Sequence, residues 1–152
     1  MTNKSLVVSL AAVLLMGTTA VVAANSAVTA NSQMEQLQAL KNYGYTHVNE
    51  LEWDDHRPQL EVEGWLADNW FAEVTFQGAG AAAEVKHERK ESKIVQPWGL
   101  TLAQVEQVMQ QANSQGMAVF EEISIDDSGR IEIEGDNANG RELELRFHIR
   151  EL

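Results

Sequence analysis

The sequence of 152 residues contains no cysteine. It therefore has no disulfide framework, no thiol chemistry and no metal site built on cysteine. The absence also excludes a lipoprotein anchor, which needs a cysteine at the cleavage point. Residues 25–152 are about the modal size of one domain, so packing alone can supply the core.

Basic side chains are also scarce. There are 11 Lys and Arg against 23 Asp and Glu, a net charge of −12, which becomes −13 if Lys4 is removed with a leader. So acidic a chain is a poor ligand for nucleic acid, whose phosphates need neutralising, and for anionic membranes. We expect no nucleic-acid partner. Solubility, cations and basic protein partners are all compatible with this charge.

Signatures of known catalysts are missing as well. There is no Gly-rich phosphate loop and no Gly-x-Ser-x-Gly elbow. His87 and Glu88 begin a zinc-protease motif, but position 91 is Glu instead of the second His. The Asp pairs at 54–55 and 126–127 do not fit the spacing of an EF-hand and are ordinary turn residues. We expect no enzyme, catalytic residue, metal or cofactor; calcium binding and an unrecognised Glu pair in a hydrolase are the alternatives.

The N-terminus has the pattern of a signal peptide. Lys4 is the only charge before residue 35, an apolar run covers residues 6–16, and small residues lead to Ala24. This pattern predicts cleavage after Ala24, with Ala30 as a second candidate. The alternative is an uncleaved anchor, although the apolar run is short for one. We expect a periplasmic or secreted protein without stable membrane insertion, beginning with a disordered leader over residues 25–31.

The sequence then repeats itself. Residues 44–77 align with 116–148 across one gap, and ten of the thirty-three pairs are identical. This predicts a duplicated unit, with repeat 1 at residues 32–93, a linker at 94–100 and repeat 2 at 101–152. Ser32 and Thr101 each begin a capping-box pattern, and glycines at 44 and 116 suit helix ends. The second helix is expected to be nearly one turn longer.

After each glycine the apolar residues alternate with polar ones, which predicts antiparallel strands with one buried face. The inward set includes His47, matched with Val119 in the second copy. Asn139-Gly140 and the stretch 126–129 predict hairpin turns, and residues 82–89 predict a fourth strand in the first copy. The expected fold is α+β: two tandem repeats, each one helix followed by three or four antiparallel strands, with the helices on one sheet face.

The outward positions are mostly glutamate. A solvated face, a docking face for a cationic partner and a cation-binding face all remain open for this pattern. Aromatic residues flank the second hairpin of the first copy only; they are binding anchors or packing between the repeats. Trp98 is expected to be core or packing between repeats. The candidate partner-binding residues are Glu61, Glu63, Trp65, Trp70, Phe71, Glu73, Glu132, Glu134 and Glu144.

The motifs Gly44-Tyr45-Thr46-His47-Val48, Leu60-Glu61-Val62-Glu63-Gly64 and Phe71-Ala72-Glu73-Val74 resemble the PepSY family. The resemblance covers residues 34–91 and, more weakly, 102–148. Asp68-Asn69 stands where the family often has Asp-Gly. A tandem pair would be similar in architecture to the beta-lactamase inhibitor protein.

The family has no catalytic residues to carry over, and the resemblance implies inhibition or regulation of peptidases and binding in the cell envelope. The leading hypothesis is an exported, non-enzymatic binding or inhibitory module whose acidic sheet face meets a protein partner in the cell envelope, such as a peptidase. The alternative is a periplasmic sensor that binds cations or a small ligand.

Overall fold

The computed structural model describes residues 29–54 and 56–152. The predicted signal peptide and residues 25–28 of the predicted leader lie outside this part. Ala30 and Asn31, the last leader residues, belong to the first helix. Within the described residues, no helix has the length and apolar character needed to cross a membrane.

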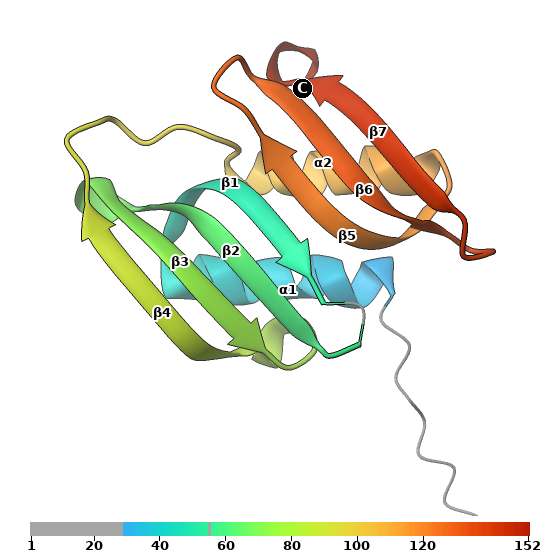
Figure 1. The fold of residues 1–152 in the computed structure, drawn as a ribbon, viewed down its shortest axis with the longest axis horizontal. Helices are drawn as coiled ribbons and strands as arrows, with labels where there is room; N and C mark the ends of the chain where they lie inside the picture. Colours follow the sequence, from blue (N-terminus) through green and yellow to red (C-terminus); the bar gives the residue numbers. More distant parts are fainter. Residues whose placement is uncertain (1–28, 55) are drawn as a thin grey trace, which may run out of the picture.

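The fold is α+β, with a helix preceding each of two runs of antiparallel strands (Figure 1). The antiparallel strands were predicted, and the structure confirms them. In chain order the elements are α1 (Ala30–Tyr43), β1 (Tyr45–Trp53), β2 (Gln59–Leu66), η1 (Ala67–Asn69), β3 (Trp70–Gln77), η2 (Gly80–Ala82), β4 (Glu84–Ser92), α2 (Leu102–Ser114), β5 (Met117–Ile125), β6 (Arg130–Asn137), β7 (Glu142–His148) and η3 (Ile149–Glu151).

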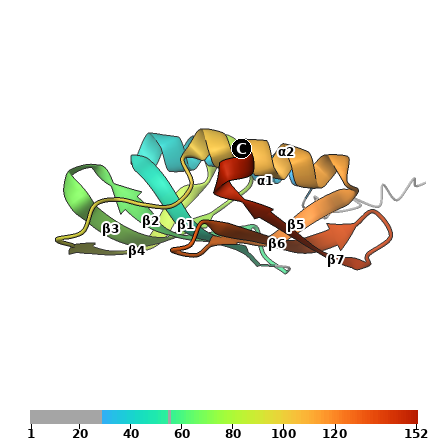
Figure 2. The same cartoon turned by 90° about the horizontal axis from the view of Figure 1, so that it is seen from above.

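All seven strands form one sheet in the order β4-β3-β2-β1-β5-β6-β7. The only strand pairing between the two halves of the sheet is between β1 and β5. It is short, with Leu51 opposite Ile123 at its centre and one further pair on each side. Figure 2 shows α1 and α2 on the same side of the sheet, and neither of these two helices lies on the opposite side. The apolar side chains that face the helices form one continuous core.

The helices begin and end differently from the prediction. Thr29, not Ser32, is the N-cap of α1, and Ser32, the third residue of the helix, forms a capping box with it. The earlier start makes α1 14 residues long against 13 for α2, so the expectation of a longer second helix was wrong. The capping box at Thr101 is confirmed. Gly44 closes α1 in the left-handed conformation, where a side chain would be strained.

The inward assignment of His47 and Val119 was wrong. Register shifts in β1 and β5 move the buried position one residue along, to Val48 and Phe120. The shifts occur where each strand passes a glycine of the neighbouring strand. A Cβ on Gly64 would lie 2.3 Å from the carbonyl oxygen of His47, and one on Gly135 would lie 2.1 Å from that of Val119. These β-bulges need a residue without a side chain opposite them.

Beyond the short β1–β5 pairing, the backbone of Val48 and Phe120 needs other hydrogen-bond partners. Val48 exchanges two backbone hydrogen bonds with Leu100, at 2.8 and 2.9 Å. At Phe120 the side-chain amide of Gln33 takes this role: it donates to the carbonyl of Phe120 (2.6 Å) and accepts from its N–H (2.9 Å). Gln33 is completely buried. A single side chain of α1 therefore supplies to Phe120 the hydrogen bonds that the backbone of the linker residue Leu100 supplies to Val48.

A second buried glutamine holds α1 to the sheet. Gln36 accepts from the indole N–H of Trp53 at 2.8 Å and donates to the carbonyl of Gly78 at 2.9 Å. When residues are counted from the N-caps Thr29 and Thr101, the residues of α2 that correspond to Gln33 and Gln36 are Val105 and Val108. Both are fully buried and apolar. The helix α2 is therefore held by packing, as predicted for its apolar face, whereas α1 is held by packing and hydrogen bonds.

The fourth strand of the first half, predicted over residues 82–89, is observed at Glu84–Ser92. Every residue of β4 is exposed, and charged side chains occupy most of it. Charged side chains on an edge strand discourage pairing with another sheet. The zinc-protease fragment that begins at His87 lies in this strand and not on a helix.

We predict that Gln33→Leu destabilises the fold by about 2 to 3 kcal/mol, because it leaves a buried N–H and a buried carbonyl of Phe120 unpaired. Denaturant unfolding followed by tryptophan fluorescence measures the loss. Gln38→Leu on the same helix is the matched control, since Gln38 is exposed and bonds only to Asn42. Equal losses for the two variants would contradict the assigned role.

Candidate functional site

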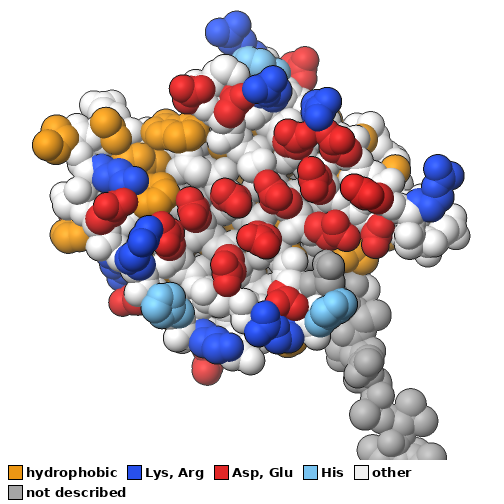
Figure 3. Space-filling view, in the orientation of Figure 1, with side chains coloured by type: hydrophobic (Ala, Val, Ile, Leu, Met, Phe, Trp, Pro, Cys, Tyr) orange, Lys and Arg blue, Asp and Glu red, His pale blue; other side chains and the backbone are white. Residues whose placement is uncertain are grey.

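The side of the sheet opposite the two helices carries a surface that we call the acidic face. Strand alternation directs its side chains away from the helices, as predicted. Figure 3 shows the carboxylates as a nearly continuous red band across the middle of the molecule. The acidic face comprises Glu50, Glu52, Glu61, Glu63, Glu73, Glu122, Glu132, Glu134 and Glu144.

The strand register arranges these glutamates in two rows that cross the sheet. One row runs from β3 to β6 through Glu73, Glu63, Glu50, Ser124 and Glu132. The other runs from β2 to β7 through Glu61, Glu52, Glu122, Glu134 and Glu144. The aligned glutamates of the two sequence copies fall in opposite rows. The predicted site residues of both copies therefore form one surface.

Positive charges contact this surface only near its outer strands, within the part of the chain that the structure describes. Arg89 on β4 forms an ion pair with Glu73. Arg146 on β7 forms ion pairs with Glu132, at 2.9 Å, and with Glu144. For the central glutamates of the acidic face, no ion pair within 4.0 Å is found among the described residues; these are Glu50, Glu52, Glu61, Glu63 and Glu122. The middle of the face is left with uncompensated negative charge.

Crowding of these charges changes their proton affinity. Partial burial raises the pKa of Glu50, and the neighbouring Glu63, Glu122 and Glu52 raise it further. The pKa of Glu63 is raised by partial burial first and then by Glu73. At the β6–β7 end, a hydrogen bond between Glu132 and Glu144 lowers the pKa of the former and raises that of the latter. The face thus holds like charges, and an incoming cation would reduce the repulsion between them.

The first aspartate of each pair that suggested calcium, Asp54 and Asp126, is used by a hairpin turn. Asp126 accepts from the N–H and hydroxyl of Ser128 and from the N–H and guanidinium of Arg130, and these bonds lower its pKa. Asp54 accepts in the same way from His56 and Arg57. Each of the two carboxylates therefore stabilises a hairpin turn by hydrogen bonds. In the described ranges, no three or more His, Asp or Glu side chains are grouped as metal ligands.

The aromatic candidates lie at one end of the acidic face, beside β2 and β3. Trp65 follows Glu63 on the outward side but is only 2% exposed, so it is not itself an open contact surface. Its ring meets that of Phe71 edge-on, with centroids 5.3 Å apart. Trp70 is 44% exposed, but it shares the strand alternation of the core residues Ala72 and Val74, so its side chain is not directed to the acidic face. Trp98, expected to be core or packing between repeats, is instead 41% exposed, because the linker runs along the outside of the sheet.

The linker contributes two apolar side chains that sequence reasoning did not select. Ile94 is fully exposed and Val95 is 54% exposed. Next to them, the ammonium group of Lys93 lies over the ring of Phe71, 4.0 Å from its centroid. The signal in the sequence was the apolar pair directly after a run of charges. The aromatic end and the linker together extend the site beyond the predicted residues.

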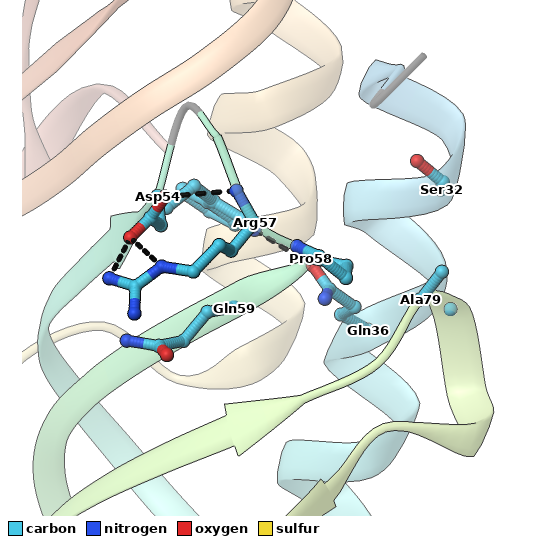
Figure 4. Close-up of a pocket in the computed structure, with 9 residues that line it drawn as sticks. Ser32, Gln36, Asp54, Arg57, Pro58, Gln59 and Ala79 are labelled. Atoms are coloured by element: carbon cyan, nitrogen blue, oxygen red, sulfur yellow. Dashed lines mark hydrogen bonds and ion pairs between the residues drawn. The ribbon is translucent and has the colours of Figure 1, made fainter. Parts of the chain in front are cut away.

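A separate pocket lies between α1, the β1–β2 turn and η2 (Figure 4). It is partly open to solvent and is lined by Gln36, Asp54 and Arg57 among others. Asp54 and Arg57 are paired with each other, and both polar ends of Gln36 are already bonded. No free polar group among these three points to a ligand, so the pocket does not compete with the acidic face as a candidate site.

Comparison of the chain with protein-family models, with curated proteins and with solved structures gave no match.

We predict that Glu50→Gln raises the midpoint of thermal unfolding at pH 7. The folded-state pKa of Glu50 lies above the ordinary value of 4.5, so stability falls as pH rises from about that value through the higher folded-state pKa. Removing the charge removes this loss. The gain should shrink toward zero at pH 4, where the carboxyl group is largely protonated in both states.

Thermal unfolding of wild type and variant at pH 7 and pH 4 measures the effect. Glu106→Gln is the matched control, because Glu106 is exposed on α2, away from the acidic face. A lower midpoint for Glu50→Gln at pH 7, or a gain that is the same at both pH values, would contradict the electrostatic origin.

Proposed function

We propose that the chain is an exported, non-enzymatic binding or inhibitory module that presents the acidic face to a basic protein surface. The observation that carries this proposal is the central block of glutamates without ion-pair partners among the described residues. Adjacent like charges on neighbouring strands are destabilising. A partner that supplies Lys or Arg to the face reduces that repulsion. Formation of the complex therefore recovers free energy that the repulsion costs the free protein.

We further infer that the fold is a tandem duplication, with α1 and β1–β4 as one unit and α2 and β5–β7 as the other, joined by the β1–β5 pairing and with both helices on one sheet face. The aligned glutamates then occupy equivalent places in the two units. The resemblance to the PepSY family supports this arrangement and suggests an envelope peptidase as the partner. A signal peptide at the N-terminus fits the same location, in the periplasm or outside the cell.

The size and flatness of the face favour a protein over a small ligand. The glutamates are spread over six strands instead of converging on one point, and no described group of side chains has the arrangement of a metal site. Small ligands bind in concave pockets, and the one described above lies elsewhere. The cation or small-ligand sensor is therefore the second choice.

Affinity capture from native cell-envelope extract tests the proposal. The wild type and the charge-matched control Glu35→Gln/Glu106→Gln should recover the same partner. Glu63→Gln/Glu134→Gln should lose it, since one charge is removed from each row, while both double variants change the net charge by the same amount. We expect recovery to fall at least about tenfold, equivalent to about 1.4 kcal/mol.

Equal recovery by the three proteins would overturn the acidic face as the binding surface. A panel of envelope peptidases, assayed with and without the protein, then tests the inhibitory role. Inhibition that is lost in the face variant and kept in the control would support it.

A further inference from the structure

The aromatic end of the acidic face differs from the rest of the sheet because apolar groups from two parts of the chain meet there. Figure 3 shows a group of hydrophobic side chains at the upper left, beside the carboxylates. We call the exposed apolar residues of the linker, Ile94, Val95 and Trp98, together with Phe71 beside Lys93, the linker patch.

Contacts of the linker hold this patch in place. At one end, the N–H of Lys93 donates to the carbonyl of Asn69, and its ammonium group covers Phe71. At the other end, Asn49 donates to the carbonyl of Trp98, and Leu100 pairs with Val48. The linker is thus fixed to β1 and to the β2–β3 turn, while Ile94 and Val95 between these anchors remain exposed. Contiguous exposed apolar groups with a polar border are typical of interaction sites.

Unpaired buried atoms mark the same end of the sheet. In the described part of the chain, two buried side-chain polar atoms lack a hydrogen-bond partner, Nε1 of Trp65 and Oδ1 of Asn49. They lie on neighbouring strands. The other polar atom of the Asn49 side chain, Nδ2, donates to the carbonyl of Trp98. Trp65 is 2% exposed, and its ring packs edge-on against the ring of Phe71.

We propose that this end of the acidic face binds an extended, basic polypeptide segment that carries an apolar anchor. The anchor packs on the linker patch, and the Lys or Arg side chains that follow it lie along the glutamate rows, beginning at Glu73 and Glu63. Charge complementarity selects this occupant: the glutamates beside the patch would repel an anionic lipid surface or an acidic segment. The inference rests on the proposed function and adds the partner's chemistry and its direction on the sheet.

Two synthetic peptides test the inference by calorimetric titration of the full chain. The first alternates Lys and Ser and probes charge alone. The second is the same peptide preceded by Ile-Phe, and it should bind at least about tenfold more tightly, as burial of one apolar anchor allows. Ile94→Ser/Val95→Ser should remove this gain and leave binding of the first peptide unchanged. Val85→Ser is the matched control, since Val85 is an exposed apolar residue at the far end of β4.

The outcomes separate the two proposals. Equal affinity for both peptides, or a gain that survives in Ile94→Ser/Val95→Ser, overturns the linker patch as an anchor site and leaves the acidic face standing. If both peptides bind and Glu63→Gln/Glu134→Gln binds them as tightly as the wild type, the acidic face itself fails. Sedimentation of the wild type alone tests a second copy as occupant: a dimer that Ile94→Ser/Val95→Ser dissociates overturns the proposal.

Discussion

The short pairing of β1 with β5 is the constraint on which the rest of the structure depends. Because the two strands share only three residue pairs, each leaves a stretch of backbone that needs another hydrogen-bond partner. Leu100 supplies it for Val48, and Gln33 supplies it for Phe120. Leu100 fixes the end of the linker, and Gln33 fixes α1 against the other half of the sheet. The linker route, and with it the exposure of Trp98, follows from this one junction.

The same sheet separates two kinds of surface. Towards the helices, alternate residues form an apolar core. Away from them, the intervening residues put carboxylates from six strands side by side, with Arg89 and Arg146 as counter-charges near the edges. The raised pKa values of Glu50 and Glu63 are the direct result of this crowding and partial burial. Stability and the proposed binding function therefore oppose each other at the same residues.

The sequence predicted the features that depend on local pattern. Strand alternation, the hairpin turns near Gly129 and Gly140, the cap at Thr101 and the outward glutamates were all predictable because each depends on neighbouring residues. The bulges were not, since the steric limit at Gly64 arises from the adjacent strand. The role of Gln33 was not predictable, because nothing in the local sequence shows that Phe120, 87 positions away, needs its amide. For the same reason the sequence could not show that the linker patch lies beside the glutamates.

The distribution of charge over the two faces also has a consequence for how the molecule moves in a field. The glutamates of the acidic face, set against Glu35, Lys41 and Glu106 on the two helices, give the protein an electrostatic asymmetry along the normal to the sheet. A basic body that approaches would experience a torque that turns the face towards it before any contact forms. Orientation, normally a slow part of a random encounter, is then partly achieved during diffusion. The asymmetry of the sheet thus acts on the rate of encounter, independently of the contacts that later determine how long a complex lasts.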